Sequence, residues 1–99
     1  LHVGNGRWAS IGDSLARVAA FVEAWLRRGI LEIRRADYAA AERELSEALR
    51  LDPGFAEAWL ERGNARRAGK GDPAAVEDYR TALRINPTLQ ARIPLKDLR

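Results

Sequence analysis

The sequence repeats itself at an interval of 34 residues. Residues 22–55 align with residues 56–89 without a gap, and bulky, small and helix-ending residues all coincide. A regular interval of this length is typical of chains built from stacked copies of one supersecondary unit. The coinciding pairs are Trp25 and Trp59, Gly29 and Gly63, Ala41 and Ala75, Ala48 and Ala82, Leu49 and Leu83, and Pro53 and Pro87.

Each copy is predicted to form a hairpin of two helices. Apolar residues recur at intervals of three and four from Trp25 to Ile33, which places them on one stripe of a helix. A second stripe runs from Ala39 to Leu51, and Pro53 ends it because the residue before a proline avoids the helical conformation. Glycine and alanine at the coinciding positions allow the two helices to approach closely.

This pattern resembles the tetratricopeptide repeat, whose consensus is W-x2-L-G-x2-Y, then A-x3-F, then P. The resemblance covers residues 22–89. It implies an all-α fold in which antiparallel helix-turn-helix hairpins stack as a short right-handed superhelix, an α-α solenoid. The matching residues are Trp25, Gly29, Ala41 and Pro53 in the first copy and Trp59, Gly63, Ala75, Tyr79 and Pro87 in the second.

Charged residues replace apolar consensus positions in both copies. Arginine stands at the consensus leucine, as Arg28 and Arg62, and the consensus tyrosine is replaced by Glu32 and Arg66. Leu45 replaces the consensus aromatic of the first copy. We therefore expect packing between hairpins to be partly ionic, with Arg28 pairing with Glu32 four residues later on the same helix.

The N-terminal region lies before the two repeats. Residues 1–12, which include several glycines, predict a flexible tail, and residues 13–21 predict a helical extension of the repeat domain. The apolar stripe continues through this extension, so one long first helix is expected over residues 13–35. A break near residues 20–22, giving a short separate helix, is the alternative.

The repeat domain is expected to span residues 13–89, with residues 90–99 as a C-terminal cap or tail because Pro94 prevents a long helix. Two hairpins are few for a solenoid, in which each repeat buries its face against a neighbour. The apolar face of the first helix must be covered by the tail, by a second copy of the chain or by further parts of a longer protein. This face comprises Val18, Phe21, Val22 and Trp25.

The composition favours a folded chain without catalytic chemistry. Hydrophobic residues make up 46% and charged residues 31% of the sequence. No apolar run approaches the roughly 18 residues that a membrane span needs, so a soluble, cytoplasmic protein is expected. The chain has no cysteine, and its single histidine, His2, falls in the predicted tail. Because no nucleophile with a base, metal-ligand cluster or cofactor motif is recognised, we predict neither an enzyme nor a cofactor or metal site.

The resemblance implies a binding function. In this family the first helix of each repeat lines a concave face that holds a partner peptide. Carried over by position, this face combines an apolar groove with a cationic end. It suits a protein or peptide partner with apolar anchors and, optionally, acidic groups. The expected partner-binding residues are Leu26, Ile30, Ile33, Arg34, Leu60, Asn64 and Arg67.

Three alternatives stay open. Leu26, Ile30 and Leu60 can instead be buried against a neighbouring helix or a homodimer partner. The chain can serve as an oligomerisation or structural segment of a larger solenoid. Nucleic-acid binding through arginines is the runner-up to peptide binding, although Glu23, Glu32, Glu57 and Glu61 dilute the positive field. The arginines concerned are Arg27, Arg34, Arg35, Arg66 and Arg67.

Overall fold

The protein is described by a computed structural model that covers the backbone of residues 2–95 and 98 and the side chains from residue 12 onward within that range. The described residues form α-helices joined by short turns, followed by one 3-10 helix, and contain no strand. The elements are α1 (His2–Arg34), α2 (Tyr38–Leu51), α3 (Ala56–Lys70), α4 (Asp72–Ile85) and the 3-10 helix η1 (Pro87–Arg92).

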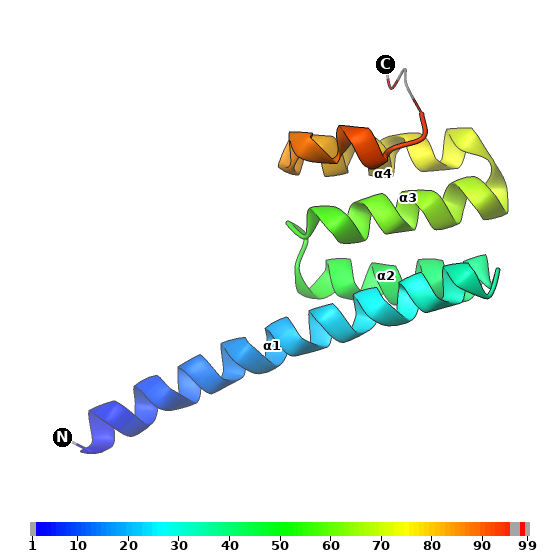
Figure 1. Ribbon diagram of the computed structural model, residues 1–99. Coiled ribbons are helices and arrows are strands. Elements are labelled where there is room, and N and C mark those ends of the chain that lie inside the picture. The colour runs from blue at the N-terminus through cyan, green and yellow to red at the C-terminus, as the bar shows by residue number, and fades with distance from the viewer. Residues whose placement is uncertain (1, 96–97, 99) are drawn as a thin grey trace.

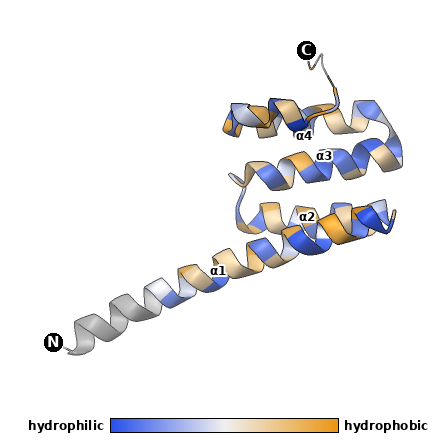
Figure 2. Ribbon diagram, in the orientation of Figure 1, coloured by the Kyte–Doolittle hydropathy of each residue, from blue (hydrophilic) through white to orange (hydrophobic). Residues whose placement is uncertain are grey.

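The helices pair as two hairpins that stack on one another. α1 packs against α2 in the first hairpin, and α3 packs against α4 in the second. The two hairpins meet where α2 contacts α3 (Figure 1). Hydrophobic and hydrophilic residues alternate along the helices, as expected of helices that bury one face (Figure 2). The predicted all-α fold of stacked antiparallel hairpins is therefore confirmed.

The N-terminal helix differs from the prediction. α1 begins at His2, whereas the sequence predicted a flexible tail over residues 1–12, and it continues through residues 20–22 without a break. Glycines in this stretch each cost a helix about 1 kcal/mol relative to alanine, but they keep the backbone N–H, so the helix propagates through them. The side chains of residues 2–11, including that of His2, lie outside the described part.

The absence of a turn signal explains why α1 is continuous. Residues 52–55, which end α2, read Asp-Pro-Gly-Phe, whereas the residues one repeat interval earlier, 18–21, read Val-Ala-Ala-Phe. The earlier segment thus has neither the proline that stops a helix nor the glycine that favours a turn. As a result α1 extends far beyond the stacked hairpins (Figure 1).

Two glycines, one in each repeat, set the close approach of the paired helices. A Cβ atom at Gly29 would lie 2.4 Å from Cγ of Leu45, and one at Gly63 would lie 2.7 Å from Cε1 of Tyr79. Both distances are shorter than any normal carbon contact. The repeat interval relates the two pairs, so each hairpin is closed by the same contact between a glycine on its first helix and a large residue on its second.

An ion pair joins the hairpins, as the charged consensus positions predicted, because Arg66 of α3 reaches Glu42 of α2 at 3.0 Å. Other pairs join the two helices within each hairpin, and one of these partners differs from the prediction. Arg62 and Arg66 both pair with Asp78, at 2.8 Å and 3.2 Å. Arg28 pairs with Glu44 on α2 at 3.5 Å rather than with Glu32, so the predicted pair along one helix is wrong. The structure places Arg28 over the Trp25 ring, 5.0 Å from its centre, and turned toward α2.

The same arrangement recurs one interval later. Arg62 lies 4.8 Å from the centre of the Trp59 ring and pairs with Asp78, as Arg28 does with Trp25 and Glu44. Each repeat therefore contains a tryptophan on its first helix, an arginine stacked over it, and a carboxylate on its second helix. Cation–π contact and ion pairing together hold the arginine in one orientation.

The C-terminal segment covers the end of the second hairpin. Leu89 of η1 and Ile93 are buried in one apolar cluster with Leu60, Ala75 and Tyr79. This segment thus shields α3 and α4 where a further repeat would otherwise stack.

Candidate partner-binding surface

Leu26 and Leu60 do not line a groove. They are 4% and 1% exposed, respectively, so the prediction of both as partner-binding residues is wrong and the alternative of burial is right for them. Leu26 belongs to the apolar cluster between α1 and α2, where Gly29 lets the helices approach closely. Leu60 belongs to the second apolar cluster, which also contains Tyr79 and Ile93.

The remaining predicted residues on α1 form one surface. Ile30 and Ile33 are half-buried and pack on the first apolar cluster, and Arg34 is exposed. Arg27 lies two helical turns before Arg34 and is also exposed. Among the described side chains, neither Arg27 nor Arg34 forms an ion pair. Sequence reasoning had not placed Arg27 on this surface, although its seven-residue spacing from Arg34 was the available signal.

On α3, Asn64 is held in place by its neighbours. The hydroxyl of Tyr79 donates to Oδ1 of Asn64 at 2.6 Å, and Nδ2 of Asn64 donates to Oε1 of Glu61 at 3.0 Å. Burial raises the pKa of Tyr79, which outweighs the opposite effect of nearby Arg67, so the phenol stays protonated and keeps donating. Asn64 therefore contributes a fixed amide to the surface.

Arg67 is an exposed cation of α3. Its Nη1 lies 3.7 Å from Oδ1 of Asp72, and both side chains are largely exposed, so this pair is weak and exchangeable. Nearer η1, Arg92 reaches Glu57 at 3.8 Å and Glu61 at 3.5 Å. The acidic side chains at that end of α3 are thus partly neutralised from within the chain.

Residues 22–65 match the family model described as Tetratricopeptide repeat. The matched residues belong to the tetratricopeptide repeat (TPR) family. The matched part contains the whole of the first predicted repeat, and it ends within α3, in the first third of the second. TPR domains mediate protein–protein interactions. No curated protein matches the TPR chain.

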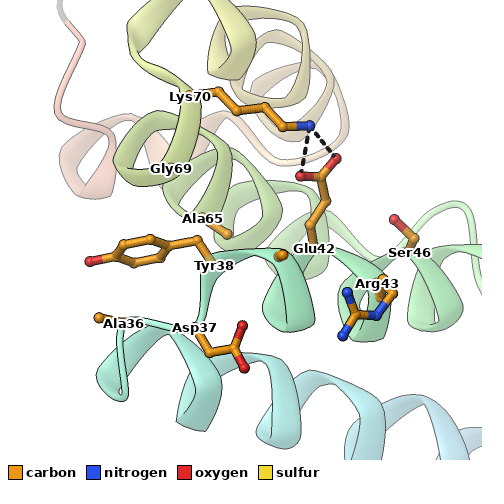
Figure 3. A pocket seen from close by; sticks show the side chains of 10 residues that line it. Ala36, Asp37, Tyr38, Glu42, Arg43, Ser46, Ala65, Gly69 and Lys70 are labelled. Atoms are coloured by element: carbon orange, nitrogen blue, oxygen red, sulfur yellow. Dashed lines mark hydrogen bonds and ion pairs between the residues drawn. The ribbon is translucent and has the colours of Figure 1, made fainter.

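The TPR chain also has an open cleft of about 690 Å³ between α2 and the end of α3. Its charged side chains are largely in use, because Lys70 reaches Glu42 at 3.1 Å and the Asp37 carboxylate accepts from the backbone N–H of Ala40 at 3.2 Å. Figure 3 shows Lys70 extending from α3 to Glu42, with Tyr38 pointing away from the pair. This cleft therefore offers few free polar groups to a ligand.

The arginines considered for nucleic-acid binding are mostly paired in the TPR fold. Arg35 pairs with Glu32, Arg66 with Glu42 and Asp78, and Arg67 with Asp72. Only Arg27 and Arg34 of that set have no ion pair within the described residues. Two free arginines do not make the continuous basic surface that binding to nucleic acid requires.

Two further searches cover only the described residues of the TPR chain. No cluster of His, Cys, Asp or Glu there has the makings of a metal site. None of the described helices is long and apolar enough to span a membrane.

Proposed function

We propose that this TPR chain is a non-enzymatic scaffold or adaptor that binds a peptide or helix of a partner protein on the side formed by α1 and α3. One observation carries the proposal. Half-buried Ile30 lies between Arg27 and Arg34, two exposed cations without an ion pair among the described residues. An apolar contact flanked by unpaired positive charges suits recognition of a ligand that has both apolar and acidic groups.

The spacing of the cations defines the partner further. Arg27 and Arg34 are separated by two helical turns, or about 10 Å along α1. A ligand with one apolar anchor over Ile30 and Ile33, and with carboxylates on either side of that anchor, matches this spacing. Planar guanidinium groups bind carboxylates in two-pronged fashion, which favours Asp and Glu side chains in the partner.

α3 supplies the other side of the proposed surface. Asn64 offers a rigid amide, since Tyr79 and Glu61 fix its orientation. Arg67 can exchange its exposed partner Asp72 for a carboxylate of the ligand at little cost, because both groups already face solvent.

The proposal is tested by selecting ligands from a random peptide library and measuring the affinity of a selected peptide by calorimetry. We expect peptides with an apolar residue flanked by acidic ones. The double variant Arg27→Glu and Arg34→Glu should weaken binding by about tenfold or more, while the helical content stays unchanged. The matched control is Arg43→Glu, which changes an exposed arginine of α2 that has no ion pair in the described part.

Two results would contradict the proposal. Equal losses in the double variant and in Arg43→Glu would show attraction to net charge rather than to a surface. Full affinity in the double variant would place the ligand elsewhere on the chain.

A further inference from the structure

The contact between α2 and α3 shows what one face of a first helix in this chain packs against. Ala58 and Ala65 of α3 are 0% and 1% exposed in the apolar cluster that includes Leu45 and Leu49 of α2. Between them, Arg62 donates to the hydroxyl of Ser46 on α2 at 3.2 Å, and its side chain is only 14% exposed. We call this face of α3 the α3 seam. It comprises Phe55, just before the helix, and Ala58, Arg62 and Ala65.

The equivalent face of α1 is uncovered. One interval earlier stand Phe21, Ala24, Arg28 and Leu31, which we call the α1 seam. Phe21 is 59% and Leu31 43% exposed, and the side chain of Arg28 is 64% exposed. Two large apolar side chains on one helix face, with an arginine between them, form a surface that in the second repeat is buried by a helix.

The chain does not supply its own cover for the α1 seam. The segment that lies one interval before α2 is residues 4–17, and it forms the straight N-terminal part of α1 (Figure 1). A straight helix cannot fold back on its own face. The covering helix must therefore come from outside α1.

The charged residues on this face of α1 differ from those on α3. A helix that binds there must therefore differ in charge from α2. Arg62 and Arg66 of α3 meet Ser46 and Glu42 of α2. On α1 the corresponding residues are Arg28 and Glu32. A helix in the same position therefore needs an acceptor opposite Arg28, but a carboxylate opposite Glu32 would be repelled.

We propose that the α1 seam is a second docking surface, which adjoins the surface of Arg27 and Arg34 along α1, for an amphipathic helix of a partner protein. The helix lies antiparallel to α1, as α2 lies to α3. It places leucine-sized side chains over Ala24 and Leu31, a hydroxyl or carboxylate group opposite Arg28, and a neutral or basic residue opposite Glu32. Phe21 packs at the end of this helix.

The probe is a peptide with the sequence of residues 37–53, held helical by a staple between positions 43 and 47, which are directed away from the α3 contacts. A second peptide carries Glu42→Ala. The full chain and its Glu32→Arg variant are each titrated with both peptides.

The Glu42→Ala peptide should bind the unmodified chain about fivefold more tightly than the unaltered peptide does. In Glu32→Arg this preference should disappear or reverse, because the variant reproduces the pairing of Arg66 with Glu42.

Controls locate the binding site. Leu31→Asp should abolish binding of the Glu42→Ala peptide, whereas Arg84→Glu, on the exposed surface of α4 in the second hairpin, should leave it unchanged. Circular dichroism confirms that each variant folds. A peptide preference that ignores Glu32→Arg, or binding that survives Leu31→Asp, would overturn the proposal. So would a molar mass showing that the chain alone is a dimer that Leu31→Asp dissociates, since the occupant would then be a second copy.

Discussion

Nη2 of Arg62 lies 2.8 Å from Oδ1 of Asp78, a carboxylate that is 1% exposed. Arg66 reaches the same carboxylate from the next turn of α3. A buried acid with two arginine partners contributes to stability only while all three are present, because any charge left alone in the interior is costly.

Asp78→Ala should lower the free energy of unfolding by about 3–5 kcal/mol, since it leaves two arginines without their shared partner. Urea denaturation measures the change. Glu44→Ala is the matched control one repeat earlier. It should cost no more than about 1 kcal/mol, because its partner Arg28 is largely exposed. Similar losses in both variants would contradict the assigned difference in burial.

Gly63→Ala should destabilise the fold by about 1–3 kcal/mol, because the new methyl group would overlap the Tyr79 ring at 2.7 Å. Gly12→Ala provides the contrast, as nothing lies within 4 Å of a Cβ atom there. It should stabilise α1 by up to about 1 kcal/mol through helix propensity. Thermal unfolding of both variants tests the pair of predictions; a stabilised Gly63→Ala would show that the hairpin is not closed by this contact.

Stability should fall at high pH through Tyr79. Burial raises the pKa of this phenol above its usual value of 10.0, so the unfolded chain loses the proton first. The stabilising contribution is complete below pH 10 and declines as the pH rises through the higher folded pKa. Unfolding free energies between pH 9 and 11 should therefore decrease less steeply in Tyr79→Phe. That variant should also lose about 1 kcal/mol at neutral pH with the hydrogen bond to Asn64.

The contribution of Glu42 to stability depends on pH in the opposite direction to that of Tyr79. Burial alone would raise its pKa, but hydrogen bonds from Lys70 and Arg66 outweigh burial and hold the pKa below its usual value of 4.5. The stability that these partners contribute is therefore present above pH 4.5 and is lost as the pH falls through the folded pKa. Glu42→Gln should flatten the acid limb of the stability profile. An unchanged limb would mean that Lys70 and Arg66 do not favour the ionised form.

The repeat interval predicted the hairpins because residues at fixed positions of each repeat make the contacts within a hairpin. Gly29 and Gly63 mark where paired helices touch, and Pro53 marks where a helix ends, so spacing alone located them. The charged consensus positions likewise predicted an ionic contact between hairpins. They did not identify Glu44 as the partner of Arg28, since that choice depends on how α1 and α2 face each other.

The binding surface was less predictable for the same reason. The apolar cluster that buries Leu60 includes Ile93, which lies beyond the repeats in a segment whose path no periodicity specifies. The extent of α1 was missed because glycines near its start were weighed as breakers. The missing turn signal at residues 18–21 was the better guide to its continuity.

Because α1 is unbroken, its N-terminal part forms a rigid projecting arm. Residues 2–21 project about 30 Å at the rise of an α-helix, and no hinge separates them from the part of α1 that packs on α2. A body joined at the outer end would be held at a set distance and would turn whenever the hairpins turn. Such a connection passes on torque as well as position, which a glycine-rich linker of the same length cannot do.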